Sequence, residues 1–185
     1  MTNHIDLSTV LRQTVSCELY SNLVTRPTGA AVRTEIERLV AEMRERSLTI
    51  IDFSHVSMID FSCADEVVAK LLLRYCADRP PRDAYFLFRG LSDHHWDAIE
   101  AVLERHGLAL AIEQEDGVHV VGVLPDDERR AWETLDRLGQ AVPSTLADLL
   151  DRAPDDVERS LAELWRRRLV MKVDDGWVAV GGYRG

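Results

Sequence analysis

The sequence has few cysteines and no long apolar run. It contains three cysteines, Cys17, Cys63 and Cys76, and no CxxC pair. This usage argues against a zinc ribbon and against a disulfide scaffold. No apolar run approaches the ~20 residues of a membrane helix. The first residues lack the basic and apolar regions of a signal peptide. We therefore expect a reduced, cytoplasmic protein that does not enter a membrane.

The chain also lacks an excess of basic residues. It has 22 Lys and Arg against 32 Asp and Glu, which gives a net charge of −10. Bulk attraction therefore does not bring the whole chain to nucleic acid. Neither a Walker loop nor a GxGxxG motif is present, which argues against nucleotide hydrolysis. His94 and His95 have no third ligand at metal spacing and are expected in a solvated helical turn. We expect no metal and no cofactor.

The clearest pattern in the chain is a strand followed by a helix. Leu48–Phe53 is a short apolar, β-branched run, which is typical of a strand covered on both faces. Apolar residues then recur at helical spacing between Ala64 and Tyr75. Ser62 precedes this helix and Asp65 follows three residues later. The sequence therefore predicts a capping box in which Ser62 is the N-cap.

Further strand and helix patterns alternate through the first 124 residues. They predict weak strands at Leu7–Val15 and Cys17–Val24, a helix at Ala30–Arg46 capped by Thr28, a strand at Ala84–Phe88, a helix from Ser92 to Gly107, and strands at Leu108–Glu113 and Val118–Leu124. Asp116-Gly117 is a hairpin signal between the last two. This order predicts an α/β (α+β) fold, a mixed sheet with crossover helices.

A different pattern begins after a predicted linker at residues 125–130. Helical patterns at Trp132–Leu138, Ser144–Leu150 and Pro154–Trp165 precede two strand patterns at Leu169–Val173 and Trp177–Val180. Three helices followed by a hairpin resemble a winged helix-turn-helix. We therefore expect two domains, at residues 1–124 and 131–185, and the second to be a small winged-helix domain.

The first domain resembles a divergent STAS domain, the domain of anti-sigma factor antagonists. The resemblance lies in the strand, the short loop and the Asp60-Phe61-Ser62-Cys63 segment that opens the helix. The usual loop of the family is Asp-Ser-Ser-Gly, and a partner kinase phosphorylates its second serine. Asp60 matches the acid and Ser62 the phosphorylated serine, whereas Phe61 and Cys63 replace the other two residues. The resemblance implies a GHKL-type serine kinase or ATPase as the partner.

Ser62 therefore has two interpretations. As an N-cap it only fixes the start of the helix, which is worth about 1 kcal/mol. As a phosphoacceptor it would lie at a partner interface, where an added dianion repels a docking protein. The candidate partner-binding residues beside it are Asp60, Phe61, Cys63, Asp65 and Glu66. Cys63 is otherwise expected to be an inert small residue.

The C-terminal domain has two interpretations as well. Residues 126–185 hold 13 acidic against 10 basic residues, and the third helix opens with Asp155-Asp156. Acids there oppose contact with DNA phosphates. The nucleic-acid contact candidates are Arg166, Arg167, Arg168 and Lys172. A role in protein–protein contact or in homodimer formation is favoured over DNA binding.

The sequence thus predicts a bacterial regulatory adaptor that acts by binding and is not an enzyme. The alternative is a DNA-binding transcription regulator whose STAS-like half senses a signal. A third class is an enzyme that uses Ser62, His55 and Asp60, since a serine, a histidine and an acid can form a nucleophile–base set.

Overall fold

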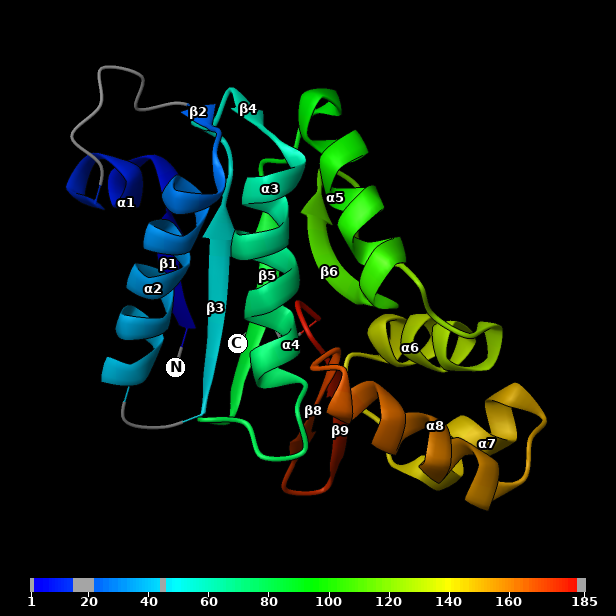
Figure 1. The fold of residues 1–185 in the computed structure, drawn as a ribbon. Coiled ribbons are helices and arrows are strands. Elements are labelled where there is room, and N and C mark those ends of the chain that lie inside the picture. Colours follow the sequence, from blue (N-terminus) through cyan, green and yellow to red (C-terminus); the bar gives the residue numbers. More distant parts are fainter. Residues whose placement is uncertain (1, 15–21, 44–45, 183–185) are drawn as a thin grey trace.

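A five-stranded sheet lies at the centre of the computed structural model, which describes residues 2–14, 22–43 and 46–182 (Figure 1). The strand order is β1-β3-β5-β6-β7. The strands are β1 (Thr2–Asp6), β3 (Ser47–Asp52), β5 (Ala84–Arg89), β6 (Ala109–Gln114) and β7 (Gly117–Gly122). The first four strands pair in parallel, and β7 pairs antiparallel to β6. The predicted mixed α/β sheet and its terminal hairpin are confirmed.

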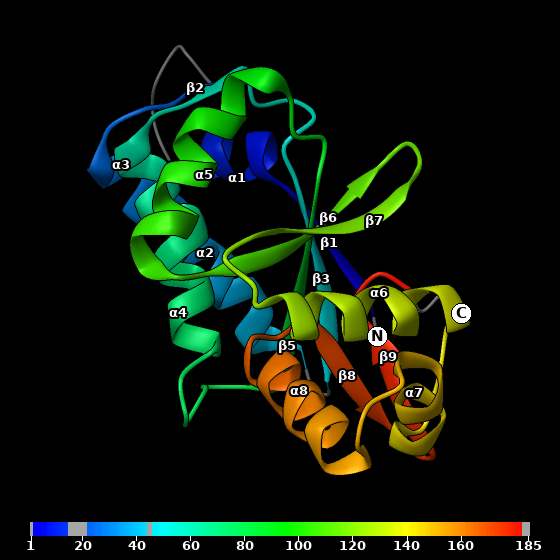
Figure 2. The ribbon, with the colours of Figure 1, turned by 90° about the vertical axis from the view of Figure 1, so that its right-hand side faces the viewer.

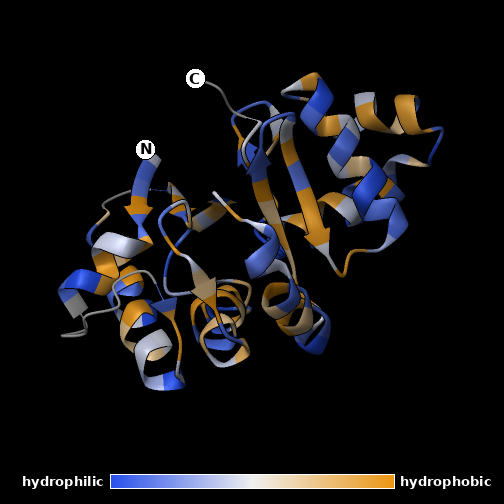
Figure 3. Ribbon diagram, turned by 90° about the horizontal axis from the view of Figure 1, so that it is seen from above, coloured by the Kyte–Doolittle hydropathy of each residue, from blue (hydrophilic) through white to orange (hydrophobic). Residues whose placement is uncertain are grey.

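The strand register divides the sheet between two hydrophobic cores. Ile51 pairs with Ile5 on one side and with Phe88 on the other, and this row belongs to the first core. The next row, which includes Leu87 and Ala111, belongs to the second core. Successive side chains of a strand point to opposite faces, so the near-continuous apolar runs of β3 and β5 supply both cores. Figure 3 shows hydrophobic stretches of the ribbon on strands and on helices.

Helices from the first 106 residues of the chain cover one face of the sheet, here called the first face (Figure 2). They are α1 (Leu7–Thr14), α2 (Arg26–Glu42), a continuous helix made of α3 (Phe61–Ala64), the π-helical η1 (Asp65–Lys70) and α4 (Leu71–Tyr75), and α5 (Asp93–His106). Two short strands, β2 (Asn22–Leu23) and β4 (Met58–Ile59), pair in parallel beside α3. Because α2 and α5 flank the continuous helix, residues 63–69 are all buried.

The C-terminal segment, residues 126–182, covers the second face of the sheet (Figure 2). It consists of α6 (Asp126–Leu138), α7 (Pro143–Leu150), α8 (Pro154–Arg166) and a hairpin of β8 (Val170–Val173) and β9 (Gly176–Ala179). Its apolar residues form one core with Tyr85, Leu87 and Ala111 of the sheet. The range predicted as a linker, 125–130, instead contains the N-cap and first turn of α6. The boundary between two domains stays a prediction.

Three local predictions for the first half of the chain need correction. Leu7–Val15 was expected as a strand, but α1 occupies Leu7–Thr14, because Leu7, Val10 and Leu11 follow helical spacing and are buried on one side. The strand precedes it as β1. Only Asn22–Leu23 of the second expected strand is β-structure, and residues 15–21 lie outside the described residues. The N-cap of α2 is Thr25 and not Thr28, because Pro27 already suits the first helical turn.

The predictions for α5 are confirmed at both ends. Ser92 is the N-cap and forms a capping box with His95, and Gly107 ends the helix at a φ of 62°. His95, however, is not solvated. It is 1% exposed, its Nε2 lies 2.9 Å from the carbonyl oxygen of Val56, and burial lowers its pKa. In the described ranges, no helix combines the length and apolar character needed to cross a membrane.

Candidate functional site

Asp60 organises the start of the helix that follows β4. Its Oδ1 accepts hydrogen bonds from the backbone N–H of Cys63 at 2.7 Å and from the Ser62 hydroxyl at 2.9 Å. Its Oδ2 accepts the backbone N–H of Thr25 at 3.1 Å. Burial opposes ionisation of this carboxyl group, but these hydrogen bonds outweigh burial and lower its pKa. Asp60 therefore carries a negative charge at neutral pH and joins α3 to the start of α2.

The prediction that Ser62 is the N-cap was wrong. The helix begins at Phe61, and Asp60 occupies the N-cap position with extended backbone. Aspartate is as good an N-cap as serine, and here its side chain is placed to accept the N–H of the third helical residue. Ser62 lies inside the first turn and is half-buried. Its hydroxyl is free of the capping role and donates to the cap itself.

Strained backbone lies next to this helix start. Thr25 has φ 75° and ψ 137°, a region that residues with a side chain rarely adopt. Its N–H donates to Asp60, and its carbonyl oxygen accepts the thiol of Cys63 at 2.9 Å. The backbone N–H of Asp60 also donates to the carbonyl of Leu23 at 3.0 Å. Strain of this kind persists only where surrounding contacts hold it, and it is concentrated at functional sites.

Two large apolar side chains are exposed at the same end of the molecule. Phe61 is 36% exposed and Met58 is 49% exposed. The guanidinium of Arg105, on α5, lies 5.6 Å from the centre of the Phe61 ring. We call the surface formed by Met58, Phe61, Ser62 and Arg105 the tip surface. An exposed aromatic ring beside an arginine is the composition of a protein-binding hot spot.

Cys63 does not contribute to this surface. It is fully buried, and burial together with the charge of Asp60 raises the pKa of its thiol to about 12. It also packs tightly on α2, because a Cβ added at Gly29 would lie 2.9 Å from the Cα of Cys63. The expectation that Cys63 is a small structural residue agrees with this environment.

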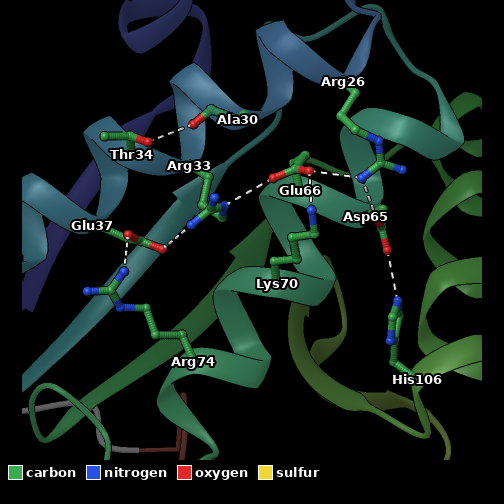
Figure 4. Close-up of polar contacts among 10 residues, drawn as sticks. All are labelled: Arg26, Ala30, Arg33, Thr34, Glu37, Asp65, Glu66, Lys70, Arg74 and His106. Atoms are coloured by element: carbon green, nitrogen blue, oxygen red, sulfur yellow. Dashed lines mark hydrogen bonds and ion pairs between the residues drawn. The ribbon is translucent and has the colours of Figure 1, made fainter.

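Asp65 and Glu66 also point away from the surface. They are 7% and 2% exposed and belong to an ion-pair network between α2, η1 and α5 (Figure 4). The Asp65 carboxylate lies 2.7 Å from Nη1 of Arg26 and 2.8 Å from Nε2 of His106. Glu66 pairs with Arg26 at 2.9 Å, with Arg33 at 3.3 Å and with Lys70. A docking protein would therefore not reach either carboxylate directly.

The same network fixes the charge of both acids. Burial raises the pKa of each carboxyl group, but the contacts with Arg26, and with Lys70 at Glu66, outweigh it and lower the pKa. The network continues to Glu37, which pairs with Arg33 at 2.7 Å and with Arg74 of α4 at 2.6 Å. It thus joins α2 to the whole length of the helix that begins at Phe61.

The basic residues proposed for DNA contact are mostly engaged within the molecule. Arg166 pairs with Glu163, with Nε 3.1 Å from the carboxylate, and Arg167 pairs with Glu128 at 3.1 Å. Arg168 is 5% exposed and donates to the carbonyl of Tyr75 at 2.9 Å. Lys172 is exposed on β8, with its Nζ 5.9 Å from the ring centre of Trp177. The structure does not bring these four residues together on one open surface.

The serine, histidine and acid of the enzyme hypothesis are not joined. Ser62 donates to Asp60, whereas His55 lies near Asp6 and helps to lower the pKa of that carboxyl group. In residues 2–14, 22–43 and 46–182, no hydrogen bond links His55 to Ser62 or Asp60, and no group of acids, histidines and cysteines could hold a metal ion. Sequence patterns had not indicated Thr25 or Arg105, which are distant in sequence from Asp60 and Phe61, the residues that they contact.

Comparisons with known proteins do not assign a function. No model of a known protein family matches the chain, and no curated protein matches its sequence. The tip surface offers a hydroxyl, an exposed aromatic ring and a guanidinium, a set that is typical of surfaces that recognise another protein.

Proposed function

We propose that this chain is a cytoplasmic regulatory adaptor, and not an enzyme, whose STAS-like N-terminal part binds a partner protein through the tip surface. The proposed partner is a GHKL-type serine kinase or ATPase, and Ser62 is the regulatory phosphoacceptor. The observation that carries the proposal is the position of Ser62. Ser62 is half-buried in the first turn of a helix, next in sequence to the exposed Phe61.

A phosphate on Ser62 would reverse the local hydrogen bonding. The hydroxyl now donates to the charged Asp60 at 2.9 Å. A phosphoserine has no donor at neutral pH and adds nearly two negative charges, so this contact becomes a repulsion. The N–H groups at the start of the helix favour the added charge. Phosphorylation would therefore rearrange the tip surface without unfolding the helix behind it.

The ion-pair network gives the tip surface a rigid support. The N-cap Asp60 and the buried Asp65 both attach the helix to α2, through Thr25 and Arg26. A partner that docks on Phe61 and Met58 thus meets side chains whose backbone is already ordered. Binding to a preorganised surface loses less conformational entropy, which favours affinity.

Phosphosite mapping tests the proposal. The purified chain is incubated with native extract and ATP, and phosphopeptides are identified by mass spectrometry. We expect phosphate on Ser62 in the wild type and its loss in Ser62→Ala. Ser57→Ala is the matched control, because Ser57 is an exposed serine in the preceding loop. Phosphate on Ser57, or on neither serine, contradicts the assignment of Ser62.

The C-terminal segment supports a second candidate function. Its order of three helices and a hairpin, α6-α7-α8-β8-β9, is the observation that favours a winged-helix domain. In the adaptor proposal this segment supplies a second protein contact, such as a homodimer interface. In the alternative it binds DNA, with Arg166 and Lys172 as its exposed cations. DNA affinity that falls steeply with salt and is lost in Lys172→Ala would favour the alternative.

A further inference from the structure

A groove lies between the loop that follows α4 and the C-terminal half of α8. Its volume is about 510 Å³, which is within the range of roughly 300–1,000 Å³ of small-molecule sites. Ala77 and Pro80 line it from the loop, and Ala162 and Trp165 line it from α8. The groove therefore lies where the N-terminal part of the chain meets the C-terminal segment. Small-molecule sites occur preferentially at such junctions.

The indole of Trp165 is held in a fixed orientation at this groove. Its Nε1 donates to the hydroxyl of Tyr85 at 3.0 Å, and Tyr85 is fully buried in the sheet. The guanidinium of Arg168 lies 5.3 Å from the Trp165 ring centre and 5.4 Å from the Tyr85 ring centre. Trp165 nevertheless remains 41% exposed. A large, ordered and accessible aromatic surface is thus available to a ligand.

Four of the charged residues that line the groove form two ion pairs with each other, and two more charged residues do not. Arg168 pairs with Asp83 at 3.0 Å, and Arg166 pairs with Glu163. Arg82 and Asp78 also line the groove, and within the described residues neither of them makes an ion pair or a side-chain hydrogen bond, although the charge of Asp78 helps to raise the pKa of Arg166. Arg82 is half-buried and Asp78 is exposed. One cation and one anion therefore remain for a ligand beside an apolar floor.

We propose that this groove binds a free α-amino acid with an apolar side chain. The carboxylate of the ligand would pair with Arg82 and its ammonium with Asp78, and its side chain would pack on Trp165 and Pro80. A ligand with one charge would leave either Arg82 or Asp78 without a partner. A zwitterion satisfies both, and an aromatic ring gains the most from the indole surface. This inference does not depend on Ser62 or on the tip surface.

Titration calorimetry of the full chain with L-phenylalanine tests the proposal. We expect a Kd below about 1 mM for the wild type and affinity about tenfold weaker in Arg82→Gln. Asp78→Asn should weaken binding about threefold, since an exposed ion pair contributes less. Arg79→Gln is the matched control, because Arg79 is exposed in the same loop but does not line the groove. It should change the affinity by less than about twofold.

Two further comparisons distinguish the zwitterion from simpler ligands. 3-Phenylpropanoate lacks the ammonium and 2-phenylethylamine lacks the carboxylate, so both should bind more weakly than phenylalanine.

Quenching of tryptophan fluorescence by phenylalanine should be lost in Trp165→Phe and retained in Trp177→Phe. Equal affinity of wild type and Arg82→Gln, equal binding of 3-phenylpropanoate, or no heat with phenylalanine would overturn the proposal. Unfolding midpoints of each variant show that the fold is retained.

Discussion

The two faces of the sheet bury charge in different ways. On the first face, acids are buried: Asp65 and Glu66 lie between helices and receive Arg26 and Arg33 from α2 (Figure 4). On the second face a base, Arg168, is buried, together with one acid, Glu128, which pairs with Arg167. Arg168 donates to the carbonyl of Tyr75 and pairs with Asp83. The first arrangement joins helices that the sheet topology already places side by side. The second attaches the C-terminal segment to the rest of the chain.

The two ends of the helix from Phe61 to Tyr75 make different contacts. The helix from Phe61 to Tyr75 presents Ser62 at its start and accepts Arg168 at its last carbonyl. Its middle is the π-helical η1, which carries both buried acids. π-Helical segments are uncommon and are found frequently at functional sites. The tip surface and the C-terminal segment are therefore connected through a single helix.

The largest effect is expected where the first face loses its central acid. Glu66→Ala removes the carboxylate that Arg26, Arg33 and Lys70 share, and it should lower the free energy of unfolding by about 4 kcal/mol. Glu163→Ala removes a surface partner whose side chain is 44% exposed, so it should cost less than about 1 kcal/mol. Urea unfolding measures both. Equal midpoints for the two variants would contradict the central role of the network.

The second face should be sensitive to Arg168. Arg168→Ala removes the donor to Tyr75 and the partner of Asp83, and we expect a loss of about 3 kcal/mol in unfolding free energy. Arg159, which is 78% exposed and pairs with Asp156, is the control, and its change to alanine should cost less than about 0.5 kcal/mol. Guanidinium unfolding followed by fluorescence distinguishes them. A harmless Arg168→Ala would show that the C-terminal segment does not need this attachment.

Smaller effects are expected at the start of the helix, where the two candidate caps can be separated. Asp60→Ala removes the acceptor of the Cys63 N–H and should cost about 1.5 kcal/mol. Ser62→Ala removes only a donor to Asp60, so about 0.5 kcal/mol is expected. Thermal unfolding of the two variants gives the order. A larger loss in Ser62→Ala would restore Ser62 as the structural cap and weaken its regulatory assignment.

The smallest effect concerns pH. The pKa of Asp65 is lowered below 3.8 in the folded chain, so the unfolded state binds the proton first on acidification. The ionised Asp65 contributes its full stabilisation above the unfolded pKa of 3.8, and this stabilisation is lost as the pH falls through the lower pKa of the folded chain. Asp65→Asn should therefore flatten the loss of stability on acidification below about pH 5. Asp155→Asn, an exposed change in α8, should leave the slope unaltered. Equal slopes of stability against pH in the wild type and in Asp65→Asn would contradict a stabilising role for the ion pairs of Asp65.

Apolar spacing predicted the mixed sheet, whereas turn and capping residues, Asp116-Gly117, Ser92 and Gly107, predicted the β6–β7 hairpin and both ends of α5. It did not predict which polar residues are buried. Asp65 and Glu66 follow the first turn of a helix, where acids are usually solvated, and only the packing of α2 and α5 on both sides covers them. Arg168 was predicted in a basic surface cluster, and only the tertiary position of Tyr75 and Asp83 explains its burial. The cap moved to Asp60 because either residue satisfies the same capping pattern.

Capture of binding proteins from native extract tests the adaptor proposal most directly. The immobilised wild type is compared with Ser62→Asp and with Ser57→Asp, which adds the same charge to the neighbouring loop. We expect a kinase or ATPase to be retained by the wild type and Ser57→Asp, and to be lost with Ser62→Asp. If all three variants retain the same proteins, Ser62 does not control a partner interface.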